Sequence, residues 1–234
     1  VNTSSGSPTF NLNIGGNSRA ATYSSLSADG KTLNFTYLIK AGDIDNNGIA
    51  IDANQLAFAG STITDAAGNS ANLGYAAVAD NLSYKVDTTP PTILSFNSIS
   101  ANKTYIVGQV IDIRATTSEA LQVGGTVTVT LDTGELVTLT RDASNATLLT
   151  GSYTVMQGDA SPDLNITGFS VGTGTKDMAG NALSTTMPSI SLAATKAIVI
   201  DGVPPAIPSL FQLDSASDTG ISNSDGYTSV NQPT

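Results

Sequence analysis

The sequence predicts an all-β protein built from tandem antiparallel β-sandwiches joined by short Asp/Pro linkers. First, apolar and polar residues alternate in several short runs, which gives each run one apolar face. Second, Thr, Val, Ile, Tyr and Phe dominate these runs, whereas Gly, Asn, Asp, Ser and Pro fill the segments between them. Third, several short motifs occur twice at a nearly constant spacing, which predicts a repeated unit.

Three runs show the alternation most clearly. The segment 31–43 carries an apolar residue at every second position from Leu33 onward, as expected for a strand with one buried face. The segments 110–116 and 126–131 alternate in the same way. The best helical candidate is a short stretch around 52–60 with weak apolar periodicity, so we expect no substantial helix.

The repeated motifs define the domain organisation. The matching pairs are "YKVDTTPPTI" at 84–93 with "IVIDGVPPAI" at 198–207, "YLIKAGD" at 37–43 with "YTVMQGD" at 153–159, and "DAAGN" at 65–69 with "DMAGN" at 177–181. A period of about 114 residues fits an array of sandwich domains better than a solenoid, whose repeats are roughly 20–50 residues long. We therefore expect a partial repeat without its opening strands over 1–88, a complete repeat over 89–202, and a linker with the opening part of a third repeat over 203–234. The chain would then be one part of a longer array of repeats.

Composition excludes several classes of function. Of the 234 residues 40% are apolar and 12% are charged, with a formal net charge of −10, and such a chain can form a core. It contains no Cys and no His, which excludes disulfides, thiolate or imidazole metal sites and the Ser–His–Asp triad. The nine Lys and Arg residues are scattered, so nucleic acid is not an expected partner. No apolar run approaches the ~20 residues of a membrane helix, so we expect no membrane insertion.

Several stretches resemble a known family. In order, they are "TSEALQVGGTVTVTLDTGE", "GSYTVMQGDASPDLNI", "KDMAGNAL" and "KAIVIDGVPP". Together they are similar to the bacterial immunoglobulin-like repeats of very large surface adhesins in Gram-negative bacteria, including biofilm-associated and RTX-type proteins. The stretch 213–234 resembles the opening of a related repeat subtype. One departure is Ala120, which follows the Ser-Glu pair where the family often has Pro.

The immunoglobulin-like topology predicts a metal site where two repeats meet. The seven strands of the complete repeat, A to G, are expected near 93–99, 109–116, 126–131, 135–140, 148–156, 165–171 and 194–200. The B–C and F–G loops of such a sandwich lie at the end where the chain enters. Glu119 of the B–C loop, Asp177 and Asn181 of the F–G loop, and Asp87 of the linker are therefore expected to converge. Carboxylate and amide oxygens suit hard cations, above all calcium, which the resemblance also implies.

The remaining candidate ligands follow the same pattern. The E–F loop of the preceding unit offers Asp43 and Asp45 to the first junction, whereas Asp65 and Asn69 would face a preceding domain. At the next junction the candidates are Asp159, Asp163 and Asp201, followed by Asp214, Asp218 and Asp225 of the third unit.

Each candidate has a simpler interpretation that the sequence leaves open. The Asp-x-Ala-Gly-Asn loops are also good turns, because Asp and Asn bond their own backbone and Gly accepts positive φ. Asp87 and Asp201 are good turn residues before proline, and Asp43 and Asp159 are good Asx caps. Glu119 is also compatible with an exposed charge on an edge strand.

The functional hypothesis is a non-catalytic extender. The resemblance implies an extracellular region of a bacterial cell-surface adhesin, stiffened by calcium and supporting cell adhesion or biofilm formation. Its partners would be the neighbouring repeats of the same polypeptide, and a host or abiotic surface reached through a distant tip. We expect no enzyme, since the paired carboxylates Asp43 and Asp45 share one loop rather than flank a cleft. The alternatives are a subunit of a surface layer or filament and a glycan- or protein-binding module, although the chain has no Trp for a binding platform.

Overall fold

The structure is a computed structural model that describes residues 2–4, 8–58, 60, 62–207, 214–219, 221, 222, 224 and 226–231. These residues form strands, turns and irregular segments, and none of them lies in a helix. The predicted all-β class is thus confirmed. Because the described part of the chain has no helix, it also has no helical span that would suit a membrane.

The central segment, residues 89–202, is a two-sheet sandwich. Its larger sheet has the antiparallel order β14-β10-β11-β12-β9-β7. The strands are β7 (Ile93–Asn97), β9 (Val110–Thr117), β10 (Thr126–Leu131), β11 (Leu136–Arg141), β12 (Leu148–Thr154) and β14 (Ile166–Val171). The smaller sheet has the order β13-β15-β8, made of β13 (Ala160–Ser161), β15 (Val199–Asp201) and β8 (Thr104–Tyr105). β15 pairs with β13 in antiparallel and with β8 in parallel orientation.

The alternation seen in the sequence produces the core of this sandwich. In β9 the side chains of Ile111, Ile113 and Ala115 are buried, and in β10 those of Val127 and Val129 are buried. The residues between them in each strand are only partly covered. One continuous apolar cluster fills the space between the sheets and includes Phe96, Leu139, Leu149, Val155, Leu164, Leu192 and Ile198. Apolar burial of this extent is the main source of stability in a chain without disulfides.

The first segment, residues 1–88, repeats the later part of this sandwich. Its main sheet has the order β4-β3-β2-β5 and contains β2 (Thr9–Ile14), β3 (Asn17–Leu26), β4 (Leu33–Thr36) and β5 (Leu56–Ala57). The same antiparallel order occurs in the central segment as β12-β11-β10-β14. A separate pair joins β1 (Asn2–Ser4) to β6 (Thr62–Thr64). The apolar residues that are buried among the described part of this segment are few, namely Ile14, Ala21, Ile63 and Val86.

Two predicted strands are shorter than expected. The strand expected over 194–200 is wrong in its first half, because the backbone N–H groups of Thr195 and Lys196 donate to the carbonyl of Leu192 and close a turn. Only β15 remains extended. The strand expected within 31–43 ends at Thr36, and Lys40 beyond it donates its backbone N–H to the carboxylate of Asp43. The two-residue strands β8 and β13 were not predicted, since two residues carry no periodicity.

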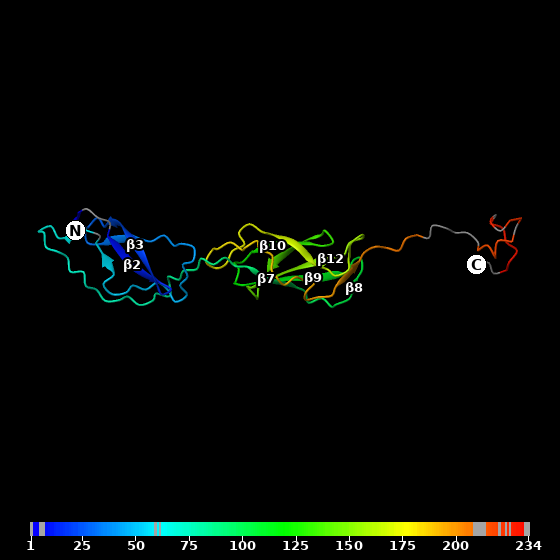
Figure 1. Ribbon diagram of the computed structural model, residues 1–234, viewed down its shortest axis with the longest axis horizontal. Helices are drawn as coiled ribbons and strands as arrows, with labels where there is room; N and C mark the ends of the chain where they lie inside the picture. Colours follow the sequence, from blue (N-terminus) through cyan, green and yellow to red (C-terminus); the bar gives the residue numbers. More distant parts are fainter. Residues whose placement is uncertain are drawn as a thin grey trace.

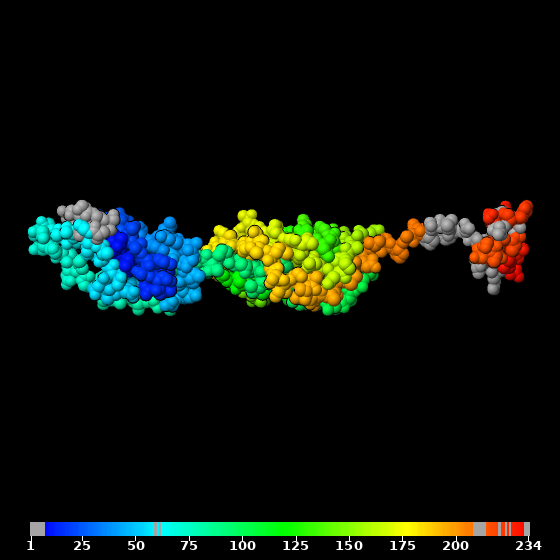
Figure 2. All heavy atoms as spheres, viewed as in Figure 1, coloured from blue at the N-terminus to red at the C-terminus, as the bar shows by residue number. Residues whose placement is uncertain are grey.

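The two segments lie end to end along the long axis of the molecule (Figure 1). The chain passes from one to the other through residues 86–92, which we call the linker. Figure 2 shows the yellow surface of the residues near 175–185 at the end of the central segment that meets the first segment. The loops predicted to hold a metal therefore lie beside the linker.

Candidate metal centre

Three carboxylates converge where the linker enters the central segment. One oxygen each of Asp87, Glu119 and Asp177 lies within 4.8 Å of the others. Asp177 is buried, and the other two are half-buried. Three residues that are distant in the sequence thus form one acidic group, as the strand topology predicted. Among the residues that the structure describes, no other group of three carboxylates comes so close together.

The Asp177 loop is shaped by its own hydrogen bonds. Oδ1 of Asp177 accepts the backbone N–H groups of Gly180 at 2.7 Å and Asn181 at 2.8 Å, and Oδ2 accepts the Asn181 side-chain amide at 2.8 Å. Gly180 has a φ of 102°, which an L side chain rarely adopts, so this position favours glycine. The motif therefore forms the turn that its sequence suggested. These donors fix the direction of the carboxylate and leave a lone pair on Oδ2, since Oδ1 accepts two bonds and Oδ2 accepts one.

Glu119 is held by the end of β9. Oγ1 of Thr117, the last residue of that strand, donates to the Glu119 carbonyl at 2.7 Å. Two residues beyond Glu119, Leu121 forms an antiparallel bridge with Asp177, which aligns the two loops. The backbone N–H of Ser118 donates to the carbonyl of Thr92 at 2.9 Å. Glu119 therefore sits between the linker and the Asp177 loop.

Asn181 connects this loop to the linker. Its side-chain Nδ2 donates to the backbone carbonyl of Asp87 at 3.1 Å, in addition to its bond with Asp177. The carboxylate of Asp87 accepts the backbone N–H of Thr89 at 2.9 Å, as expected for an Asp that begins a turn before proline. Asp87 and Asn181 thus hold the linker against the central segment.

The centre is electrostatically unfavourable without a cation. Burial raises the pKa of Glu119 above its ordinary value, and the negative charges of Asp87 and Asp177 raise it further. Like charges at short distance disfavour the ionised form, whereas a bound cation reverses this effect. The arrangement is therefore suited to a positively charged ligand.

The donor set fits calcium. Ca²⁺ takes six to eight oxygen ligands at about 2.3–2.6 Å, so two ligands on opposite sides of the ion are about 5 Å apart. The carboxylate oxygens of Asp87, Glu119 and Asp177 fall within that separation. The side-chain amide of Asn181 lies beside these residues, where its Nδ2 bonds to Asp87 and Asp177. Zinc and copper prefer nitrogen or sulfur ligands, which this chain cannot offer from His or Cys.

The corresponding loop of the first segment forms a similar turn, but within the described part of this segment it belongs to no group of three carboxylates. Oδ1 of Asp65 accepts the backbone N–H of Asn69 at 2.8 Å, and Oδ2 accepts the Asn69 side-chain amide at 2.8 Å. Gly68 has a φ of 90°. These hydrogen bonds lower the pKa of Asp65, with the side-chain bond from Asn69 as the largest cause. The motif is therefore sufficient for the turn, whereas the acidic group needs the linker and the B–C loop as well.

Asp43 and Asp159 act as caps in the structure. Oδ2 of Asp159 accepts the hydroxyl of Tyr153 at 2.6 Å and the backbone N–H of Met156 at 2.7 Å. Oδ2 of Asp43 accepts the equivalent pair of bonds, from the Tyr37 hydroxyl at 2.7 Å and the Lys40 N–H at 2.8 Å. Both carboxylates are buried within their own segment. Neither belongs to the acidic group at the linker.

Asp43 also has an ionic partner that the sequence did not suggest. Nε of Arg19 lies 2.7 Å from Oδ1 of Asp43. The backbone hydrogen bond from Lys40 is the largest cause of the lowered pKa of Asp43, followed by the bond from Tyr37, while Arg19 adds to both. Asp45 is buried too, and its carboxylate accepts the backbone N–H groups of Gly15 and Gly48 at 2.8 and 2.7 Å.

Thr88 is a linker residue that sequence reasoning missed. Its Oγ1 donates to the Asp43 carbonyl at 3.0 Å and accepts the backbone N–H of Gly42 at 3.0 Å. Thr88 thus attaches the linker to the first segment, while the preceding residue, Asp87, is attached to the central segment by Asn181. The residue aligned with Thr88 in the next junction is Gly202, whose N–H donates to the Asp159 carbonyl at 2.8 Å. Because the two aligned residues are Thr and Gly, the sequence does not reveal that both donate a hydrogen bond to the carbonyl of the aligned Asp.

The carboxylates predicted for the next junction do not form a comparable group among the described residues. Asp201 accepts the backbone N–H of Val203 at 3.3 Å, and Asp163 is exposed. Asp214 is exposed and accepts the N–H of Ala216 at 2.8 Å. Asp218 is buried, and its Oδ1 has no hydrogen-bond partner. Asp225 lies outside the described residues.

Comparisons with known proteins give two weak structural similarities. No family model and no curated protein matches the chain. A solved structure concerning host cell surface retention of a 1.5-MDa bacterial ice-binding adhesin is 17% identical, with a TM-score of 0.37, and the match covers 85% of this chain and 55% of that one. A Ca²⁺-stabilised adhesin that helps an Antarctic bacterium to bind ice is 18% identical, with a TM-score of 0.30 and coverage of 78% and 41%. This chain therefore spans about half the length of the solved chains that it matches.

Proposed function

We propose that this chain is a non-catalytic extender region of a bacterial surface adhesin, stiffened by calcium where its repeats meet. In this proposal residues 89–202 are a complete immunoglobulin-like repeat, residues 1–88 a partial one, and residues 203–234 a linker with the opening of a third. The observation that carries the proposal is the convergence of Asp87, Glu119 and Asp177 at the point where the linker enters the central segment. The repeated loops and caps of the two segments support it.

The proposed ion would add a connection between parts of the chain that already meet through hydrogen bonds, such as those of Asn181 with Asp87 and of Ser118 with Thr92. Asp87 belongs to the linker, whereas Glu119 and Asp177 belong to loops of the following repeat. When bound, calcium would offset two of the three negative charges of these carboxylates. The residues of the chain then hold the linker in one direction relative to the sandwich, and the Asn181 amide keeps its hydrogen bond to the Asp87 carbonyl. The linker would then no longer bend freely between the two segments.

A binding role suits these carboxylates better than a catalytic one. Both oxygens of Asp177 already accept hydrogen bonds from its own loop, which fixes them as ligands. Such outer hydrogen bonds commonly orient the ligands of metal sites. The resemblance to adhesin repeats adds the setting, which is the bacterial cell surface, and the partners, which are neighbouring repeats and a surface reached by a distant tip. Extracellular calcium modules bind with Kd values of roughly 10⁻⁴–10⁻³ M, so the proposed site would be filled by millimolar calcium.

The test combines small-angle X-ray scattering with thermal unfolding, each with and without millimolar calcium. We expect calcium to narrow the distribution of particle lengths and to raise the Tm of the chain. At ten times Kd, one site contributes about 1.4 kcal/mol. Asp87→Asn and Glu119→Gln should remove most of both responses. Asp65→Asn is the matched control, because Asp65 accepts the same two bonds from Asn69 and, among the described residues, belongs to no group of three carboxylates. Calcium responses that persist in Glu119→Gln, or that are absent from the unmodified chain, would refute the proposed centre.

For the remaining candidates, coordination stays a prediction. They are Asp43, Asp45, Asp65, Asn69, Asp159, Asp163, Asp201, Asp214, Asp218 and Asp225. Among these, Asp218 has the most suggestive environment, since it is buried with one oxygen that lacks a hydrogen-bond partner. Calcium binding that survives the loss of Asp87 and Glu119 but disappears in Asp218→Asn would place a second ion there.

A further inference from the structure

A polar pocket lies on the first segment between the start of β3 and the loop that follows β4. It has a volume of about 360 Å³, and its lining includes Ser18, Arg19, Tyr37, Lys40 and Asp43. Sites for small organic ligands commonly measure about 300–1,000 Å³, which is more space than a single small ion requires. The pocket is separate from the acidic group at the linker, since none of the three carboxylates of that group lines it.

The pocket carries an excess of positive charge. Nε of Arg19 lies 2.7 Å from Oδ1 of Asp43, and Oδ2 of Asp43 accepts the Tyr37 hydroxyl and the backbone N–H of Lys40. The carboxylate is thus already paired with one cation and two further donors. Within the described part of the chain, the side-chain ammonium of Lys40 forms no ion pair. One positive charge therefore remains uncompensated in the pocket, although the whole chain has a formal net charge of −10.

Several hydrogen-bond donors in the pocket are unused. Arg19 donates to Asp43 through Nε, whereas its Nη1 and Nη2 bond to none of the residues that the structure describes. The Arg19 side chain is 35% exposed, so a ligand can reach these two nitrogens. A planar guanidinium presents its N–H groups as a fork that matches two oxygens of a carboxylate or another oxyanion. Lys40 and Ser18 are both exposed and add an ammonium and a hydroxyl.

The central segment has no cation at the position of Arg19. Arg19 lies three residues before Thr22, which pairs with the first residue of β2. In the central segment Val137 lies three residues before Thr140, which pairs with the first residue of β10. Val137 is buried in the core cluster. The guanidinium is therefore a feature of the first segment and is not required by the repeated fold.

The entrance of the pocket lies on a surface that stays exposed when the sandwich is complete. The counterparts of Ser18 and Lys40 in the central segment are Leu136 and Met156, which are 66% and 55% exposed. Both are apolar, whereas the first segment has a hydroxyl and an ammonium at these positions. The accessibility of the pocket therefore does not depend on how many strands precede β2.

We propose that this pocket binds the carboxylate of a small acidic sugar, such as a uronic acid. Nη1 and Nη2 of Arg19 donate to the carboxylate oxygens, and Lys40 adds a second positive charge beside them. The remaining volume holds the sugar ring, whose hydroxyl groups suit the hydroxyl of Ser18. This volume favours a sugar over a free oxyanion such as sulfate, which would need only the cationic part of the pocket. The inference goes beyond the calcium-dependent extender function and requires no metal.

The test follows the NMR signals of the full chain, including Nε of Arg19, during titration with glucuronate. Calcium is absent, so the result does not depend on the proposed metal centre. Glucose, which lacks the carboxylate, and sulfate, which lacks the ring, are titrated separately. Lys40→Gln removes one cation and keeps the Asp43 cap, because Lys40 contributes only its backbone N–H to that cap. Arg19→Lys keeps a positive charge beside Asp43 and removes the guanidinium fork.

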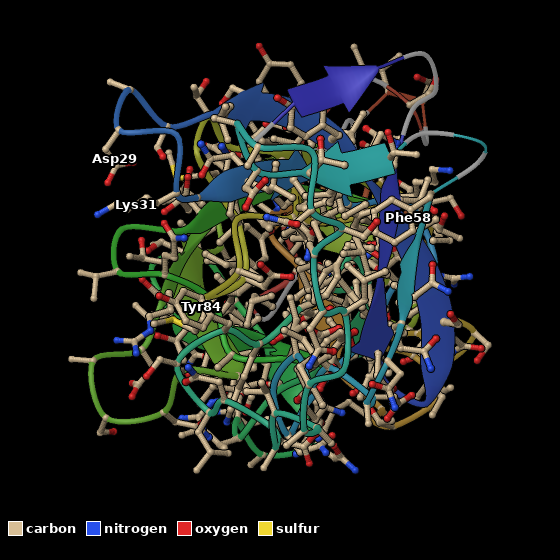
Figure 3. The ribbon with its side chains drawn as sticks, turned by 90° about the vertical axis from the view of Figure 1, so that its left-hand side faces the viewer. Asp29, Lys31, Phe58 and Tyr84 are labelled. Carbon is tan, nitrogen blue, oxygen red and sulfur yellow. The ribbon has the colours of Figure 1, made fainter. Side chains whose placement is uncertain are left out.

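Lys31→Gln is the matched control, because it removes the same charge from another part of the first segment. Lys31 lies beside Asp29 in the loop between β3 and β4, and Figure 3 labels both residues. This loop follows the end of β3, whereas Arg19 lies near the beginning of that strand. The control therefore changes the net charge of the chain without changing the pocket.

We expect glucuronate to shift the signals of Arg19 and its neighbours in a saturable manner at millimolar concentration. Lys40→Gln should weaken binding about threefold, as for an exposed ion pair. Arg19→Lys should weaken it about tenfold, as for the loss of a charge-assisted hydrogen bond. Lys31→Gln should leave the affinity unchanged. Equal affinity in all four chains, or an equal response to glucose, would overturn the proposal. Sulfate that binds as tightly as glucuronate would refute the role of the sugar.

Discussion

The side chain of Asn181 donates a hydrogen bond to the backbone carbonyl of Asp87, across 94 residues of sequence, at 3.1 Å. Its Nδ2 also bonds to Oδ2 of Asp177 at 2.8 Å. The final Asn of the repeated loop therefore has two roles, closing its own turn and holding the linker. In the first segment Asn69 closes the turn in the same way through Asp65.

Asn181→Ala should loosen the connection between the segments. The substitution removes two partly buried hydrogen bonds, so the free energy of unfolding of the central segment should fall by about 1–3 kcal/mol. Scattering curves should also show a broader distribution of particle lengths. Asn69→Ala removes only the bond within its own loop and should leave that distribution unchanged. If both variants broaden it equally, the bond to Asp87 has no role in orientation.

The calcium response should depend on pH through Glu119. Because burial and then the charges of Asp87 and Asp177 raise its pKa in the folded state, the ion-free protein should lose stability as pH rises from 4.5, the ordinary value, through the raised one. Calcium requires the ionised form, so its affinity should fall as pH is lowered through the same window. Thermal unfolding in chelator and calorimetric titration at several pH values measure the two effects. Glu119→Gln should flatten both profiles, and a profile that it leaves intact would assign the titration elsewhere.

Tyr153→Phe should destabilise the central segment. It leaves the buried carboxylate of Asp159 without the hydroxyl that donates at 2.6 Å, and the loss of a hydrogen bond to a charged group costs about 1.5–3 kcal/mol. Urea unfolding measures the change. Tyr37→Phe is the matched variant in the first segment, where Asp43 keeps its contact with Arg19. We expect a smaller effect there, and the reverse order would contradict the importance of the ionic partner.

Gly151→Ala should be poorly tolerated, whereas Gly168→Ala should be neutral. A Cβ at Gly151 would lie 2.5 Å from the backbone carbonyl oxygen of Thr138 and 2.8 Å from Cδ2 of Leu139, so the paired strands must shift. Such overpacking costs about 1–3 kcal/mol. A Cβ at Gly168, in β14, meets no atom within 4 Å. Unfolding midpoints of the two variants test the packing of the sheet, and equal midpoints would show that the core accommodates the added methyl group.

The sequence predicted the elements whose pattern is periodic. The run from Thr126 to Leu131 has the expected bounds, because every second side chain enters the core. The beginning of the strand expected over 194–200 was not predictable, since the turn at Leu192–Lys196 depends on backbone bonds between residues that also suit a strand. The two-residue strands β8 and β13 exist only because β15 lies between them.

The candidate site was predictable to a similar degree. The topology brought Asp87, Glu119 and Asp177 to one end of the sandwich, as the structure has them. It did not separate ligands from caps, because Asp43 and Asp159 each follow a Gly in a loop that was expected to face a junction between repeats. What decides their role is the hydroxyl of a tyrosine six residues earlier, and its direction depends on the fold. The role of Thr88 could not be predicted, since its hydroxyl donates to Asp43, whereas the aligned Gly202 donates its backbone N–H to Asp159.

The adjacent residues Asp87 and Thr88 are attached to different segments, and this determines how a pulling force travels along the chain. Tension applied from the first segment acts on Thr88 and its contacts with Gly42 and Asp43 before it reaches the rest of the linker. It then meets the bond from Asn181 to Asp87 before it can load β7, the first strand of the sandwich. These hydrogen bonds at the junction therefore carry the load before the strands of the central segment do.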